Sequence, residues 1–218
     1  MIDVINLKKS FGSHDVLNGI DITINKGDIV VVIGPSGSGK STFLRCLNCM
    51  EDPTGGQIIF NDVDIADPHV DINVHRRHMG MVFQHFNLFN NKTVLENIML
   101  APVHVHCKGL HGAKRKEEVK KIREQAMGLL ARINMQDKAD VYPSTLSGGQ
   151  KQRLTIARAL VKQPEILILD DSSSALDFAT DAKLRKAVHN LEGNTTTFLV
   201  SQRIAGIRQA DQILVLGN

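Results

Sequence analysis

The sequence predicts an α/β fold with a mostly parallel core sheet, an antiparallel β subdomain near the start and a helical subdomain in the middle. Short β-branched runs alternate with longer helical patterns, and one apolar run ends in a glycine-rich turn. The later apolar runs are continuous, as buried parallel strands are. With 218 residues, 42% hydrophobic and 22% charged, the chain fits one globular domain and excludes a tandem or disordered architecture.

Each predicted element follows from its local pattern. Two short alternating stretches, 3–6 and 21–24, indicate antiparallel strands. The run 28–33 is a strand that ends in the glycine-rich turn, and 41–48 is the helix that follows it. Helical spacing dominates 93–132, and we expect a helical subdomain at about 88–162 within a single domain spanning 1–218. The remaining predicted strands are 57–60, 80–83, 166–169, 196–200 and 212–216.

Apolar runs, cysteine content and charge indicate where in the cell the chain is expected. No apolar run approaches the roughly 20 residues that a membrane-spanning helix needs, and the first ten residues lack the apolar stretch of a signal peptide. Three cysteines, an odd number, favour reduced thiols over a disulfide framework. We therefore expect a cytoplasmic chain. Its formal charge of +3 is too small to indicate a nucleic-acid partner, and none is expected.

The strongest chemical signal is the segment GPSGSGKST at 34–42, which matches GxxxxGK[ST] between a predicted strand and a predicted helix. Its backbone N–H groups can turn toward phosphate oxygens, Lys40 adds a positive charge, and Ser41 can place a hydroxyl on Mg²⁺. A glycine-rich turn without a ligand is the alternative, but the agreement of strand, loop and helix favours a triphosphate site. The expected nucleotide-binding residues are Ser36, Gly37, Ser38, Gly39, Lys40, Ser41 and Thr42.

A second signal is ILILDD at 166–171, an apolar strand that ends in two acids. Acids often simply terminate strands. Beside a phosphate-binding loop, however, Asp170 suits a Mg²⁺ ligand acting through water. Mg²⁺ is therefore expected at Ser41 and Asp170, beside the triphosphate.

A third segment, LSGGQ at 146–150, precedes a predicted helix for which Ser147 is a good N-cap. With the phosphate loop, Gln84 in MVFQ and SALD at 174–177, it follows the order and spacing of ATP-binding subunits of ABC transporters. The chain resembles that family over nearly all of its length. This resemblance implies a head-to-tail dimer that holds ATP between one chain's phosphate loop and the other chain's LSGGQ. It also implies transmembrane partner subunits that hold the chain peripherally on the inner face of the cell membrane.

The same resemblance assigns roles to single residues. Phe11 matches the aromatic residue that stacks on adenine, and Val16 lies beside it. Gln84 matches the residue that touches Mg²⁺ and the attacking water and senses the membrane partner. The further nucleotide-binding residues that the resemblance implies are Ser147, Gly148, Gly149, Gln150 and Asp177.

Two positions depart from the family's hydrolytic pattern. Asp171 stands where most members carry glutamate, and its side chain is about 1.3 Å shorter; a misplacement of about 1 Å can cost about a hundredfold in rate. Gln202 stands where the family carries histidine, and it can hydrogen-bond the γ-phosphate but cannot carry a positive charge. We expect both to act in catalysis with Gln84, and we expect good ATP binding with slow turnover.

The resemblance changes character along the chain. Residues 1 to about 145 resemble the ATPase of a polar amino-acid importer, whereas residues from about 153 resemble a cassette of a heterodimeric multidrug-type exporter. One hypothesis is a recombinant of two lineages joined at about 144–154, and the alternative is one divergent family.

Three functions remain open. The chain is an energy-coupling ATPase for amino-acid import, or a hydrolysis-deficient or chimeric cassette that acts only beside an active partner. A soluble ABC protein acting on the ribosome or DNA is the third. The second ATP-binding subunit can be an identical or a different chain.

Overall fold

The structure is a computed structural model that describes residues 1–170, 195–200 and 210–217. The chain divides into two compact units. The first contains Met1–Met81 with the described parts of 165–171 and 189–218, and the second contains the described residues from Val82 to Pro164. Among the described residues, no helix has the length and apolar character needed to cross a membrane.

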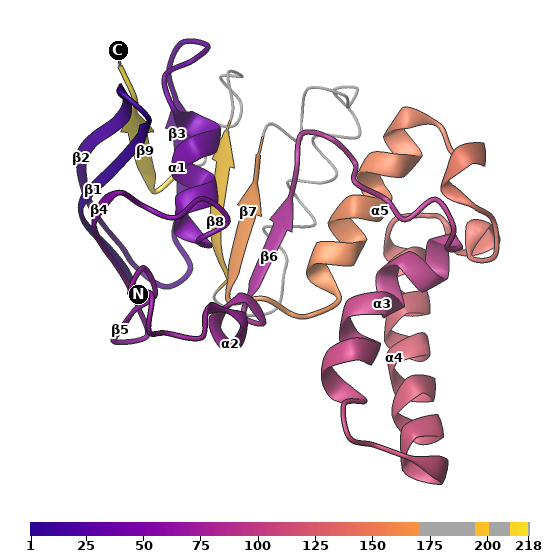
Figure 1. Cartoon of the computed structure of the whole chain (residues 1–218). Helices are drawn as coiled ribbons and strands as arrows, with labels where there is room; N and C mark the ends of the chain where they lie inside the picture. Colours follow the sequence, from indigo (N-terminus) through magenta and orange to yellow (C-terminus); the bar gives the residue numbers. More distant parts are fainter. Residues whose placement is uncertain (171–194, 201–209, 218) are drawn as a thin grey trace. The chain divides into compact units, whose positions relative to one another are not determined.

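The predicted antiparallel subdomain and parallel core sheet are both present (Figure 1). A four-stranded sheet has the order β2-β1-β4-β5, and its pairings are antiparallel. A five-stranded sheet has the order β6-β7-β8-β3-β9; β3 pairs in parallel with β8 and β9, and β7 pairs in parallel with β8. The strands are β1 Ile2–Phe11, β2 His14–Ile24, β3 Ile29–Ile33, β4 Gly55–Phe60, β5 Val63–Asp64, β6 Met79–Val82, β7 Ile166–Leu169, β8 Thr196–Val200 and β9 Gln212–Val215.

β1 and β2 are longer than the stretches predicted from the sequence. The pairing register shifts between Val4 and Leu7, and Asn6 there takes a φ of 47°. Such an irregularity lets a strand continue past a residue that breaks the alternation. As a result β1 runs to Phe11, which pairs with His14 across the turn.

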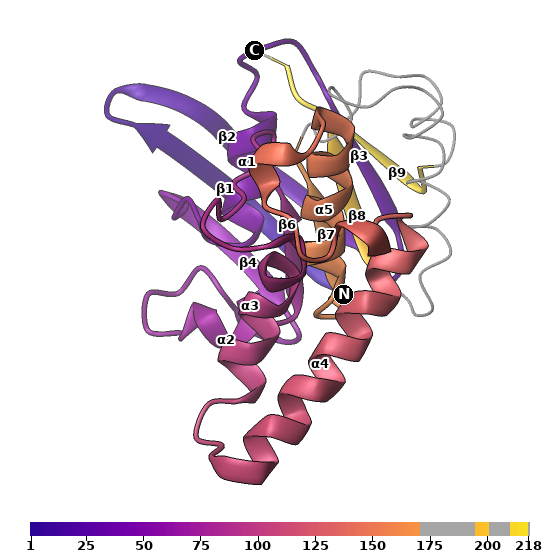
Figure 2. The same cartoon turned by 90° about the vertical axis from the view of Figure 1, so that its right-hand side faces the viewer.

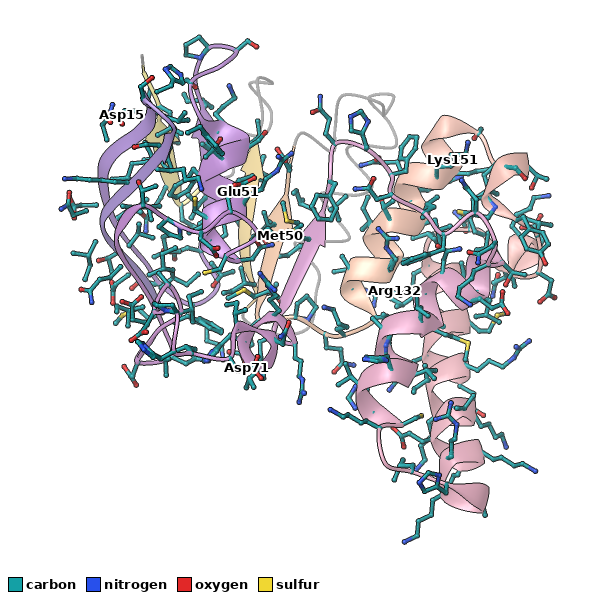
Figure 3. All side chains as sticks on the ribbon, viewed as in Figure 1. Asp15, Met50, Glu51, Asp71, Arg132 and Lys151 are labelled. Carbon is teal, nitrogen blue, oxygen red and sulfur yellow. The ribbon has the colours of Figure 1, made fainter. Side chains whose placement is uncertain are left out.

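The core of the first unit contains side chains from both sheets and from α1 (Lys40–Leu47), the helix that follows the phosphate loop. Phe43 and Leu44 of α1 are fully buried in this cluster, together with Val30 of β3 and Phe198 of β8. Burial of this apolar face fixes α1 at the end of β3. A short helix, α2 (Ile72–Arg76), follows Asp71, which is its N-cap and is labelled in Figure 3; the Asp71 side chain accepts a hydrogen bond from Asn73 N–H.

The second unit is helical. Its elements are α3 Val94–His106, α4 Gly112–Arg132, the 3₁₀ turns η1 Gln136–Lys138 and η2 Pro143–Thr145, and α5 Gly148–Leu160. Figure 2 shows α3 and α4 as a helical hairpin, joined by a turn in which Gly109 has a φ of 78°. α4 buries Ile122, Ala126 and Leu130, at the four-residue spacing that the sequence shows. These side chains join a core with α3 and α5.

Candidate nucleotide-binding site

The phosphate loop connects β3 to α1 in the first unit, and its glycines have steric roles. A Cβ at Gly34 would overlap the Leu216 carbonyl oxygen, because Leu216 N–H bonds the Ile33 carbonyl beside it. Gly39 is the N-cap of α1 with a φ of 86°, and a Cβ there would lie 2.9 Å from Val16 Cγ1. The loop is therefore packed on the strand that carries Val16, with its backbone in a conformation that glycine allows.

The polar side chains of the loop turn back onto it. Lys40 Nζ donates hydrogen bonds to the carbonyl oxygens of Gly34 at 2.9 Å and Pro35 at 2.6 Å. Ser38 Oγ is buried and has no hydrogen-bond partner among the described residues. No described atom lies within 4 Å of the position that a Cβ of Gly37 would take. Within the described residues, the loop thus holds the Lys40 ammonium on its own backbone, leaves a buried hydroxyl unsatisfied and is open beside Gly37.

Asp170 leaves β7 next to this loop and is 1% exposed. Its Oδ1 accepts a hydrogen bond from Ser41 Oγ at 2.7 Å. Its Oδ2 has no hydrogen-bond partner among the described residues, and Arg45 Nη2 lies 3.7 Å away, too far for a hydrogen bond. A buried carboxylate oxygen without a hydrogen bond destabilises the folded state unless a cation or an ordered water binds to it.

These groups fit magnesium-bound triphosphate. Ser41 Oγ and the orphaned Asp170 Oδ2 are hard oxygen ligands of the kind that Mg²⁺ takes, directly or through water. Lys40, the Ser38 hydroxyl and the first N–H groups of α1 are hydrogen-bond donors of the kind that phosphate oxygens accept. Mg²⁺ bound there would neutralise phosphate charge.

Phe11, the expected adenine-stacking residue, stands at the end of β1 and is 47% exposed. Lys9 Nζ lies 4.7 Å from the centroid of its ring. Lys9 is held in turn by the Asp52 carbonyl oxygen at 2.8 Å and by Glu51 at 3.5 Å, and Figure 3 labels Glu51. A cation over an aromatic face is attracted to the ring, so Lys9 fixes how Phe11 presents its exposed surface.

The LSGGQ segment opens α5 in the second unit. Ser147 is the N-cap, as predicted, and it forms a capping box with Gln150: Ser147 N–H donates to Gln150 Oε1 at 2.8 Å, and Gln150 N–H donates to Ser147 Oγ at 3.4 Å. Around Gly148 and Gly149 no described atom lies within 4 Å of a would-be Cβ. The start of this 13-residue helix is therefore accessible, and its free N–H groups suit an anion.

The expected site residues fall into three groups. The phosphate loop, Asp170, Phe11 and Val16 belong to the first unit, whereas Gln84 and LSGGQ belong to the second. Gln84 is exposed and follows β6. Asp171, Asp177 and Gln202 lie outside the described residues.

Two residues with a place at the site escaped the sequence reasoning. Arg45 follows Ser41 by four residues, one helical turn, and Lys9 precedes Phe11 by two residues on the same strand. Both spacings place the pair on one face of its element, so a search for charged neighbours at those offsets would have found them.

Comparisons with known proteins agree with this geometry. The family model described as "ABC transporter" matches residues 17–174. The chain is 45% identical over 218 residues to the arginine transport ATP-binding protein ArtM of Bacillus subtilis, covering 99% of this chain and 87% of ArtM. It is 42% identical to the glutamine transport ATP-binding protein GlnQ of Geobacillus stearothermophilus, with 99% and 86% covered.

Solved structures show the same likeness. The dimeric ABC transporter cassette MJ0796 superposes with a TM-score of 0.85 at 32% identity, covering 100% of this chain and 94% of that one. A second dimeric structure of MJ0796, bound to ADP and Pi after hydrolysis, gives a TM-score of 0.84 at 33% identity, with 99% and 94% covered. This chain belongs to the ATP-binding cassette family of ABC transporters. The predicted α/β fold is confirmed, and the chain is an ABC-type ATPase with ATP and Mg²⁺ as its ligands.

Proposed function

We propose that this chain is the ATP-binding subunit of an ABC importer for a polar amino acid. The observation that carries the proposal is the 45% identity to ArtM over 99% of this chain, supported by the similar match to GlnQ. ATP-binding and transmembrane subunits work together in this family, so membrane subunits are the expected partners. They would hold the chain at the inner face of the cell membrane.

The site supports a dimer of cassettes with shared nucleotide. One chain's phosphate loop, Asp170 and Phe11 would bind Mg-ATP, and the accessible start of α5 in the other chain would contact the phosphates. Gln84 would link this site to the membrane partner. We infer one domain over 1–218 with a helical subdomain at about 88–162. The second cassette can be an identical or a different chain.

We further propose that turnover is slow, because Asp171 and Gln202 replace the glutamate and histidine of the family's pattern. The same two residues favour the second candidate function, a poorly hydrolysing cassette that completes the active site of a different, active chain. A recombinant origin has no comparable support. The alignments with ArtM and GlnQ run through residues beyond 153 and through the expected junction.

Uptake measurements test the importer function. In cells that lack the chain, uptake of radiolabelled arginine, glutamine and cystine would be compared with uptake after complementation by the wild-type chain or by Lys40→Ala. The proposal expects lost uptake of at least one of these amino acids, restored by the wild type and not by Lys40→Ala. Unchanged uptake of every polar amino acid tested would contradict it.

The double variant Asp171→Glu/Gln202→His tests the cause of slow turnover. If the rest of the site is assembled, it should raise the steady-state rate at least about tenfold with ATP affinity unchanged. No rise, with ATP still bound, would place the defect elsewhere.

A further inference from the structure

The segment of residues 83–93 between β6 and α3 is here called the Gln84 loop, and α5, which begins at LSGGQ, is called the signature helix. A side chain of the signature helix holds the Gln84 loop. Arg158 donates from Nη1 to the Asn87 carbonyl oxygen at 2.6 Å and from Nη2 to the Phe86 carbonyl oxygen at 3.3 Å. All of these residues belong to the second unit. One guanidinium therefore holds two consecutive peptide groups, two and three positions beyond Gln84.

The backbone is shaped for this contact. In an extended chain, consecutive carbonyl groups point in opposite directions and cannot both face one guanidinium. Asn87 has a φ of 46°, in the left-handed region that asparagine tolerates better than most residues. This conformation redirects one carbonyl relative to the other, so that the planar fork of Arg158 can reach both.

The partners of Arg158 named above are neutral carbonyl groups, and no carboxylate pairs with it in the described part of the chain. Burial lowers the pKa of its guanidinium, which is the sign of a cation largely removed from water. If the loop moved away from α5, the desolvated guanidinium would lose the carbonyl oxygens that offset its cost of burial, and the folded state would be destabilised. The loop and α5 are for this reason expected to move together.

A second side chain anchors the far end of the loop. Asn97 of α3 is fully buried, and its amide nitrogen donates to the carbonyl oxygens of Phe89 at 3.1 Å, Lys92 at 3.0 Å and Thr93 at 2.9 Å. Its amide oxygen accepts from Phe89 N–H at 2.9 Å. Since α3 and α5 share one apolar core, both anchors are mounted on the same packed helices.

We propose that Arg158 is a positioning residue that couples the Gln84 loop to the signature helix, so that a displacement of the loop also displaces the helix, and the reverse. The role assigned to Gln84 rests on the proposed function. Ser147, at the start of α5, precedes Arg158 by 11 residues, about 16 Å along the helix axis. A rigid helix and one guanidinium thus connect the part of the chain expected to meet the opposite nucleotide with the part expected to sense the membrane subunits.

A single fluorescent reporter can follow the loop. The chain has no tryptophan, and Phe89 is 46% exposed, so Phe89→Trp places the only tryptophan on the loop with little disturbance. In this background Arg158→Gln removes the charge and the fork, Arg158→Lys keeps the charge with a single donor centre, and Arg132→Gln is the matched control. Arg132 is an exposed arginine at the end of α4 in the same unit and is labelled in Figure 3.

The measurements are acrylamide quenching of the reporter, peptide-resolved amide hydrogen exchange, and Mg-ATP binding and hydrolysis by the full chain. For Arg158→Gln we expect quenching to rise about twofold and exchange in 85–93 to rise at least tenfold. The turnover number per bound ATP should fall at least about tenfold with KM within twofold. The quenching, exchange and turnover of Arg158→Lys should lie between those of Arg158→Gln and the Phe89→Trp background. The same values for Arg132→Gln should match the background.

Three results would overturn the inference. The first is unchanged loop exchange and turnover in Arg158→Gln. The second is exchange that rises equally throughout α3, α4 and α5, which would show a general stabilising role. The third is wild-type turnover despite a loosened loop. If Arg158→Gln does not fold, the same comparisons apply to Arg158→Lys. A background chain that binds no ATP would instead contradict the proposed function.

Discussion

Replacing Asp170 by asparagine should stabilise the nucleotide-free chain while weakening its binding of Mg-ATP. The Ser41 hydroxyl can still donate to the side-chain oxygen, so the 2.7 Å hydrogen bond is kept. The change replaces a buried charged oxygen that has no hydrogen bond in the described part of the chain by a neutral amide nitrogen that has no described acceptor. An unpaired neutral group costs about 1–3 kcal/mol and an unpaired charged group costs more, so the change relieves part of the cost. It also removes the 3.7 Å ion pair with Arg45, whose side chain is 41% exposed, worth about 0–1 kcal/mol.

The net gain for Asp170→Asn is about 1 kcal/mol, or about 2–4 °C in Tm for a chain of this size. Thermal unfolding without nucleotide measures it, with Asp137→Asn as the control, because the Asp137 side chain is 70% exposed and should shift Tm little. Titration with ATP in the presence and absence of Mg²⁺ should show that the Mg²⁺-dependent part of the affinity falls at least about tenfold. A lower Tm for Asp170→Asn, or wild-type affinity for Mg-ATP, would refute the assignment of Asp170 as the metal-facing carboxylate.

Three more predictions concern the caps and charges around the site. Ser147→Ala removes the side-chain half of the capping box and should cost about 1 kcal/mol in thermal unfolding, with ATP affinity of the monomer unchanged; no change in Tm would contradict it. Lys9→Met should weaken ATP binding about two- to fivefold, because it removes the cation that holds the Phe11 ring. The affinity for tripolyphosphate, which has no adenine, should not change. An equal loss of affinity for both ligands would contradict this explanation. Burial raises the pKa of Cys46 to about 12 and that of Cys49 to about 11, so the folded state holds their protons more tightly than the unfolded state. Stability should therefore fall as pH rises above about 9, and Cys46→Ala/Cys49→Ala should flatten that slope in pH-dependent melts.

The phosphate site was predictable because its signals are local. The run 28–33, the glycine-rich loop and the helix after it are neighbours in sequence, and Asp170 is marked by the buried strand that it ends. The Ser41–Asp170 contact joins residues 129 positions apart, yet it follows once the two strands are placed in one parallel sheet.

Other features depend on tertiary context. The register shift that extends β1 to Phe11 is stabilised by pairing with β2 and β4, which local alternation does not show. The contact of Arg158 with the Gln84 loop joins residues 71 and 72 positions apart through main-chain carbonyls. Carbonyl oxygens carry no sequence signal, so no pattern in the side chains could have indicated their partner.

Steady-state hydrolysis of saturating Mg-ATP by the purified chain, over a range of protein concentrations and with bound ATP measured in the same samples, tests the central claim most directly. We predict ATP bound at each phosphate loop with turnover below about 0.1 per second, about a hundredfold under a typical enzyme rate of about 10 per second. Absence of bound ATP, or a specific rate that climbs with concentration to about 10 per second, would contradict it.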